Sequence, residues 1–155
     1  MKFHVMTLFP DMIREGLDNS ITGRAIEKGL IDVETVDIRD YSHSKTRRVD
    51  DYPYGGGAGM VMQAGPVVEC FEELKKRIPD KCPVIYMTPQ GRVFNQRIAE
   101  ELAQYEDVVF LCGHYEGIDE RALELIVTDN ISIGDFVLTG GELPAIDRKS
   151  TRLNS

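Results

Sequence analysis

The chain has 155 residues, of which 42% are apolar and 28% are charged, which is ordinary for a globular protein and fits one domain. Eighteen basic against 26 acidic residues leave a net charge of −8, which disfavours general adhesion to nucleic acid or anionic membrane but permits a local basic patch. No apolar run reaches the ~20 residues of a membrane span, and the first residues do not form a signal peptide. Three cysteines without a CxxC pattern argue against a disulfide scaffold and predict a reducing, cytoplasmic setting.

The first part of the chain predicts alternating strands and helices. In order, these are Met1–Phe9, Met12–Leu17, Ile21–Lys28 and Ile31–Ile38, of which the first and last are strands. Asp11 and Ser20 are expected to cap the two helices, and Gly29 to stop the second. The next segment, Arg39–Gly65, shows little periodicity, and structureless loops of that length are usually functional or mobile.

The alternation continues after this segment. The predicted elements are helix Pro66–Arg77, strand Val84–Met87, helix Asn95–Ala103, strand Val108–Leu111 and helix Ile118–Ile126. Pro66 suits the first position of its helix, and Asn95 can cap the next one. Repeated alternation of strand and helix predicts an α/β layer fold with a mainly parallel sheet.

Several short glycine-bearing segments interrupt the pattern, and three of the irregular segments lie at or near the carboxyl ends of predicted strands. The glycine-bearing segments are Thr88–Arg92, Cys112–Gly117, Ser132–Asp135 and Thr139–Glu142. Ligands of open α/β sheets bind at that end, and glycine lets backbone groups approach a ligand closely. Together the segments favour a small, heteroatom-rich ligand such as a nucleoside, although each glycine alone could serve only a tight turn.

Three other motifs yield weaker predictions. Gly55–Gly59 resembles a phosphate loop but has neither the GxGxxG register nor the Lys-Ser/Thr of a P-loop. Cys112-Gly113-His114 has no second ligand pair at zinc spacing, so no metal is expected. The basic residues Lys45, Arg47 and Arg48, with tyrosines nearby, form either a solvated loop or an arm that contacts RNA phosphates and stacks on bases.

The glycine segments, taken with their neighbours, resemble one family closely. The sequence is similar to the N-terminal domain of the bacterial tRNA (guanine-N1)-methyltransferases, the TrmD family of the SPOUT class. The resemblance rests on Phe3–Phe9, DYPYGGGAGMVM at 51–62, MTPQG at 87–91, LCGHYEGIDER at 111–121 and SIGDFVLTGGELPA at 132–145.

The resemblance implies a SPOUT-type α/β fold, a mainly parallel sheet flanked by helices that closes in a trefoil knot, an exception to the usual unknotted rule. It implies a homodimer that binds S-adenosylmethionine in the knot loops and methylates N1 of the guanine 3′ of the tRNA anticodon. The cofactor-binding residues it implies are Tyr86, Met87, Thr88, Pro89, Gln90, Gly91, Gly113, Tyr115, Glu116, Gly117, Ser132, Ile133, Gly134, Asp135, Phe136, Val137, Leu138, Gly140, Gly141 and Pro144.

Among these, Glu116 is the candidate for contact with the target guanine, with local ordering of its loop as the alternative. Asp135 either faces the positive sulfonium of the cofactor or forms a turn. The candidates for tRNA phosphate contact are Arg24, Lys45, Arg47 and Arg48.

The resemblance covers residues 1–145, and 146–155 form a divergent polar tail expected to be disordered. The family continues with a helix that completes the knot, an aspartate that serves as general base and a tRNA-binding domain, all expected to be absent here. A catalytically silent fragment that binds only cofactor or RNA is therefore the alternative function. A nucleotide-binding α/β domain without methyl transfer is a third hypothesis.

Overall fold

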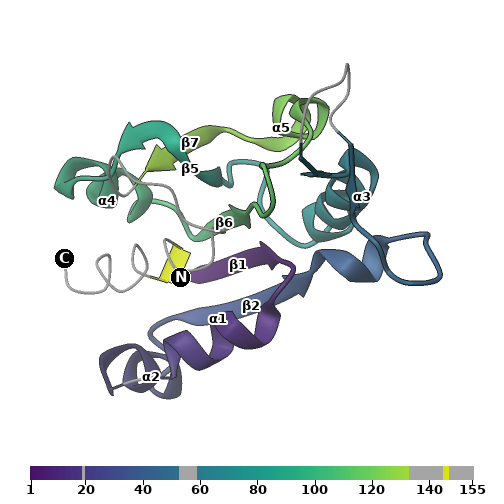
Figure 1. Ribbon diagram of the computed structural model, residues 1–155. Helices are drawn as coiled ribbons and strands as arrows, with labels where there is room; N and C mark the ends of the chain where they lie inside the picture. The colour runs from purple at the N-terminus through teal and green to yellow at the C-terminus, as the bar shows by residue number, and fades with distance from the viewer. Residues whose placement is uncertain (19, 53–58, 133–144, 147–155) are drawn as a thin grey trace.

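The computed structural model describes residues 1–18, 20–52, 59–132 and 145–146. Its core is a five-stranded sheet in the order β2–β1–β6–β5–β7, and every neighbouring pair is parallel (Figure 1). The strands are β1 (Lys2–Thr7), β2 (Asp32–Asp37), β5 (Val84–Val93), β6 (Asp107–Cys112) and β7 (Asp129–Ser132). Because all five are parallel, their carboxyl ends meet at one edge of the sheet.

Helices cover both faces of the sheet. They are α1 (Pro10–Leu17), α2 (Ser20–Glu27), α3 (Ala64–Lys75), α4 (Gln96–Leu102) and α5 (Glu120–Ile126). Buried side chains of α3 and α5 share one hydrophobic cluster, and those of α1, α2 and α4 share another. Ile146, the first residue of the expected tail, packs against the second cluster, over Gly16 of α1. The predicted parallel sheet flanked by helices is confirmed.

The first strand is shorter than predicted because Pro10 already occupies the first position of α1. Phe9 is the N-cap residue and makes no side-chain capping bond, so the prediction that Asp11 caps this helix is wrong. Asp11 instead forms an ion pair with Arg14 one turn along. Gly29 ends the next helix at φ +71°, a conformation that glycine adopts at little cost, as predicted.

The long segment 39–65 contains more regular structure than its sequence suggests. It begins in a 3₁₀ helix, η1 (Ile38–Tyr41), and includes two short antiparallel strands, β3 (Asp50–Asp51) and β4 (Val61–Met62). Val49 and Met62 are buried in the α3/α5 cluster. Two apolar anchors spaced far apart hold the segment in place, and such anchors leave no periodic signal.

Two strands also depart from the prediction. β5 continues through Thr88–Arg92, which the sequence assigned to a loop, and β7 was not predicted at all. β7 has four residues, and only Ile131 and Ser132 are buried, so local alternation is too short to detect. Asn95, in contrast, caps α4 as predicted, because its side chain accepts a hydrogen bond from the Ile98 amide at 2.9 Å.

A buried ionic cluster joins three strands. The fully buried His4 on β1 lies between Glu34 of β2, at 2.6 Å from Nδ1, and Asp107 of β6, at 2.7 Å from Nε2. Arg77, just beyond α3, also pairs with Glu34. Burial alone would raise the pKa of Glu34, but hydrogen bonds from Arg77 and His4 outweigh it and hold that pKa below its ordinary value.

Two expectations from the sequence concern the knot and a membrane span. Residues 133–144, which hold most of the last of the three knot loops that the resemblance implies, lie outside the described residues. None of the described helices is both long and apolar enough to cross a membrane.

Candidate functional site

The candidate site begins at a bulge near the carboxyl end of β5. Met87 and Arg92 both pair with Ile131 of β7, so the four residues 88–91 between them have no partner in the ladder. The β5–β7 ladder is therefore interrupted here, and the Gln90 amide donates instead to the Thr88 hydroxyl at 3.3 Å. Gly91 makes this possible: a Cβ there would lie 2.5 Å from the carbonyl carbon of Asn130 and from the amide nitrogen of Ile131.

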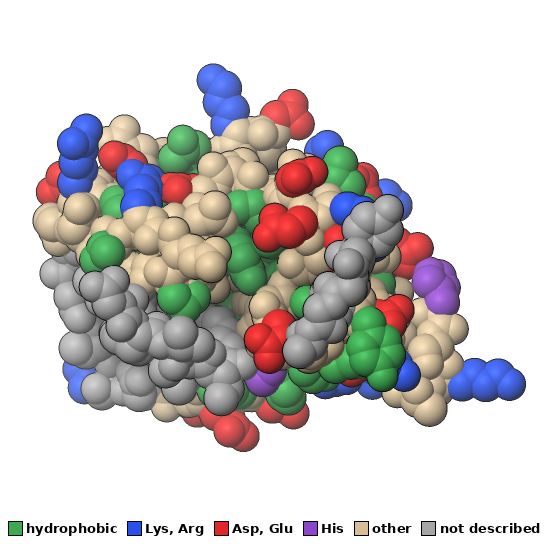
Figure 2. All heavy atoms as spheres, turned by 45° about the horizontal axis from the view of Figure 1, so that its top comes forward, with side chains coloured by type: hydrophobic (Ala, Val, Ile, Leu, Met, Phe, Trp, Pro, Cys, Tyr) green, Lys and Arg blue, Asp and Glu red, His purple; other side chains and the backbone are tan. Residues whose placement is uncertain are grey.

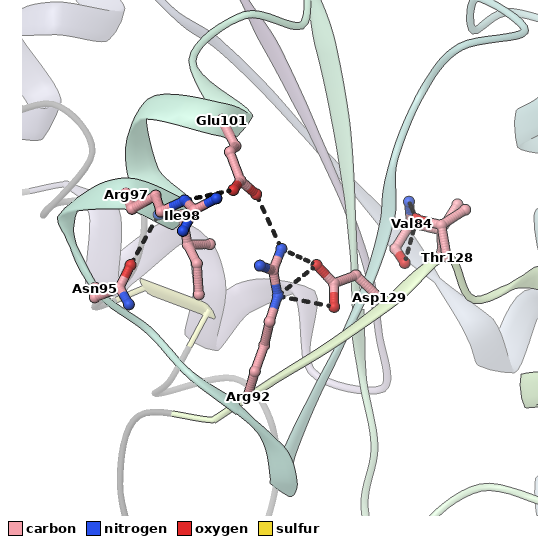
Figure 3. A network of polar contacts seen from close by, with 8 residues as sticks. All are labelled: Val84, Arg92, Asn95, Arg97, Ile98, Glu101, Thr128 and Asp129. Carbon is pink, nitrogen blue, oxygen red and sulfur yellow. Dashed lines mark hydrogen bonds and ion pairs between the residues drawn. The ribbon is translucent and has the colours of Figure 1, made fainter.

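The far end of this bulge is held by Arg92. Its Nε lies 3.0 Å from Oδ2 of Asp129, its Nη2 lies 2.5 Å from the same oxygen, and Nη2 also reaches Glu101 of α4 at 3.1 Å (Figure 3). These bonds raise the pKa of Arg92. A bidentate guanidinium–carboxylate pair fixes geometry as well as charge, so Arg92 ties the bulge to α4 and β7. The sequence analysis missed Arg92, although an arginine directly after a glycine bend was a usable signal.

An open cleft of about 680 Å³ lies on the outer side of this arginine. Arg92, Glu101 and Asp129 line it, together with Tyr105 and Ile85. Of the residues predicted for cofactor or tRNA binding, none that the structure describes lines this cleft. The candidate site is therefore the group of loops at the carboxyl edge and not this cleft.

Tyr86 connects the β5 bulge to the loop that follows β6. A Cβ on Gly113 would lie 3.0 Å from the Tyr86 hydroxyl, and one on Gly117 would lie 3.4 Å from it. Gly117 also has φ +120°, which side chains rarely allow. Burial raises the pKa of Tyr86, although a hydrogen bond with the Ile118 backbone opposes it. These three predicted residues do converge, and the two glycines leave room for the phenol.

The most informative contact joins the loop after β6 to the end of the glycine-rich segment. The Glu116 amide donates to the Met60 carbonyl at 2.9 Å, and the Met62 amide donates to the Gly117 carbonyl at 2.9 Å. A Cβ on Gly59, which has φ +86°, would lie 2.6 Å from Cγ of Glu116. The exposed side chain of Glu116 therefore lies between two loops that are more than 50 residues apart in sequence.

This pairing could not be predicted from either motif alone. Glycines 55–57 and residue 58 lie outside the described residues, so only Gly59 of this run can be placed. The GGGAG run failed every phosphate-loop test, and its last glycine instead gives Glu116 space. Tyr115, just before Glu116, has φ +57°, an uncommon conformation for an aromatic residue. Strained residues of this kind concentrate at functional sites.

The surface at this end is acidic and hollowed. Figure 2 shows acidic side chains around a hollow with hydrophobic side chains at its base, on the face that forms the upper side of Figure 1. β5, β7 and α5 lie on that side. Asp119, the N-cap of α5, has its pKa lowered by hydrogen bonds from Arg121. A ligand with positive charge is favoured here over a phosphate.

The predicted tRNA contacts do not form one patch. Arg24 lies exposed on α2, while the other three lie in the loop after η1, at the opposite end of the molecule in Figure 1. Arg47 pairs with Asp37 and Asp40, and Arg48 pairs with Asp50. Among the described residues, Lys45 has no ion-pair partner.

The remaining predicted residues divide into two sets. Ser132 is buried at the end of β7, next to the bulge. The others lie outside the described residues: Ile133, Gly134, Asp135, Phe136, Val137, Leu138, Gly140, Gly141 and Pro144. Within the described part of the chain, no cluster of three or more His, Cys, Asp or Glu side chains is arranged to hold a metal ion.

Comparison with solved structures supports this architecture. A crystal structure of the tRNA (m1G37) methyltransferase from Aquifex aeolicus superposes with a TM-score of 0.88 at 35% sequence identity. The match covers 99% of this chain and 69% of that one. The two proteins therefore share the fold.

Curated relatives of similar sequence are also tRNA methyltransferases. The chain is 66% identical over 146 residues to a tRNA (guanine-N(1)-)-methyltransferase of Lachnospira eligens, which covers 94% of this chain and 62% of the relative. It is 54% identical over 147 residues to that of Clostridioides difficile, which covers 94% of this chain and 64% of the relative. The chain thus spans about 60% of the length of these relatives. Since the family model described as tRNA (Guanine-1)-methyltransferase TrmD also matches residues 1–149, the chain belongs to the TrmD family of tRNA methyltransferases.

Proposed function

We propose that the chain forms the methyl-donor and guanine-binding part of an enzyme that transfers a methyl group from S-adenosylmethionine to N1 of the tRNA guanine 3′ of the anticodon. The observation that carries this proposal is the docking of Gly59–Met62 on Glu116–Asp119. It places the exposed carboxylate of Glu116 where two loops meet, in the same loop whose Gly113 and Gly117 approach Tyr86 of β5, in a chain of this family.

The residues fit a nucleoside-type cofactor. Such a ligand presents ring nitrogens and hydroxyls, which backbone amides and carbonyls of a bulge can bind, and residues 88–91 have no ladder partners to compete. When bound, S-adenosylmethionine supplies an electrophilic methyl group on a positively charged sulfur. The acidic surroundings of the hollow stabilise that charge.

The protein's task in this reaction is alignment. In the methyl transfer, the sulfur–methyl bond breaks as the bond from the methyl carbon to guanine N1 forms. The proton on N1 is transferred to a general base. Orientation of the two reactants supplies much of the rate. We assign Glu116 the role of holding the guanine, because its carboxylate can accept hydrogen bonds from the donor edge of that base and its backbone is fixed by Met60.

The test is methyl transfer from labelled S-adenosylmethionine to unmodified tRNA transcripts, with the chain alone and with the chain joined to the C-terminal part of a relative. We expect 1-methylguanine in the product, and none in a transcript whose target guanine is replaced by adenine. Glu116→Gln should retain cofactor affinity, measured by calorimetry, while incorporation falls. Absence of incorporation by the joined protein would refute the proposal.

A further inference from the structure

Three aromatic rings and a guanidinium pack in a row at the carboxyl ends of β1 and β6, with Phe9 tilted by 56° against His114 and Tyr115 edge-on to His114 at 73°. Of this row, the site described above includes Tyr115 alone. The Phe9 and His114 rings have centroids 4.7 Å apart, and the His114 and Tyr115 rings have centroids 5.8 Å apart. The Arg39 guanidinium lies over the other end of the row, 5.8 Å from the centre of the Phe9 ring. The residues come from three separate segments, so tertiary structure alone assembles the row.

The row is open to solvent. Phe9 is 38% exposed and Tyr115 is 45% exposed, while His114 and Arg39 are partly buried. Exposed aromatic rings beside an arginine provide flat surfaces on which nucleobases stack, and such stacking tolerates any base. This composition indicates a ligand with a π face.

The position of the row separates it from the cofactor residues. In the strand order β2–β1–β6–β5–β7, the bulge and Tyr86 belong to the β6–β5–β7 half of the edge. The row lies over the β2–β1–β6 half, because Phe9 follows β1 and Arg39 follows β2. The two halves meet at the loop of Tyr115 and Glu116.

We infer that Phe9, with His114 and Arg39, forms a stacking platform for an unpaired RNA base next to the target guanine. This inference rests on the proposed function, since Glu116 marks the place of the guanine. Arg39, at one end of the row, belongs to η1, and the loop that follows η1 carries the exposed Lys45, whose ammonium can contact a phosphate. The row therefore joins the loop of the candidate base contact to the segment that leads to a candidate phosphate contact.

A base could also come from the adenine of the methyl donor, and the experiment separates the two sources. Binding of a fluorescent anticodon stem–loop RNA is measured by anisotropy in the presence of S-adenosylhomocysteine, which permits no turnover. The proteins are the unmodified chain, Phe9→Ala, Phe9→Trp as the variant that keeps a flat ring, and Tyr105→Ala as an exposed aromatic control near α4. The RNAs are the intact stem–loop and two versions abasic on either side of the guanine.

We expect Phe9→Ala to weaken binding of the intact RNA at least about fivefold, the lower end for losing one stacked base. Phe9→Trp and Tyr105→Ala should bind as the unmodified chain does. On one of the two abasic RNAs, Phe9→Ala should cause no further loss, because the base it stacks on is already gone. Affinity for S-adenosylmethionine should stay unchanged.

Three outcomes would overturn the inference alone. In the first, Phe9→Ala binds the RNA as tightly as the unmodified chain, and in the second, it loses the same RNA affinity on the intact and both abasic RNAs. In the third, it also loses affinity for S-adenosylmethionine, which would assign the ring to the adenine of the methyl donor. If the unmodified chain binds the RNA and the joined protein methylates it, these outcomes leave the proposed function intact. No RNA binding by the unmodified chain would overturn the inference and leave methyl transfer to decide the function.

Discussion

Gly91→Ala tests whether the β5 bulge depends on the absence of a side chain. The added Cβ would lie 2.5 Å from two backbone atoms of β7, whereas ordinary contacts begin at 3.4 Å. The strand would have to move by about 1 Å, because backbone, unlike a flexible side chain, has no other rotamer. Overpacking of this kind costs about 1–3 kcal/mol of unfolding free energy, which lowers the melting temperature by roughly 3–10 °C.

The matched control is Gly65→Ala in the first turn of α3, where nothing lies within 4 Å of the added Cβ. Alanine is favoured over glycine there by up to about 1 kcal/mol, so this variant should be unchanged or more stable. Urea unfolding gives the two free energies, and calorimetric titration with S-adenosylmethionine should show weaker binding only for Gly91→Ala. If Gly91→Ala matches the unmodified chain in both stability and affinity, the bulge does not depend on this close approach.

Three further predictions concern buried groups outside the site. His4→Gln removes the ring that contacts both Glu34 and Asp107 and leaves these two carboxylates with a poorer hydrogen-bond partner, which costs about 1–3 kcal/mol of unfolding free energy. Urea unfolding at pH 7 measures this cost, and a loss below about 1 kcal/mol would contradict it. The pKa of Glu34 in the folded chain is lowered, so its contribution to the free energy of unfolding is complete above its unfolded pKa of about 4.5 and is lost as the pH falls below that value. Glu34→Gln should therefore flatten the plot of unfolding free energy against pH only in that acid range. Burial raises the pKa of Cys70 to about 12 and that of Cys82 to about 11. At pH 8 both thiols of the folded chain should therefore react with an aromatic disulfide reagent about 100-fold or more slowly than those of the chain unfolded in urea. Fast reaction of the folded chain would contradict this prediction.

Much of the regular structure followed from short-range patterns. The Asn95 cap and the Gly29 stop depend on groups within a few residues, so the sequence suffices to place them. Alternation of strands and helices predicted the parallel sheet, and parallel strands placed several glycine segments at one edge. That the loop after β6 meets β5 was therefore expected from the pattern, whereas Tyr86 itself was named only through the family resemblance.

Tertiary structure alone decided what those segments contact. The exclusion of a side chain at Gly91 is set by β7, which begins 38 residues later and is too short to reveal itself by alternation. The contact between Gly59 and Glu116 and the contact of the Phe9 ring with the tilted His114 ring join segments that share no local pattern. Propensity and periodicity act over one or two turns of chain, whereas close approach and stacking depend on strand register and packing across the whole sheet.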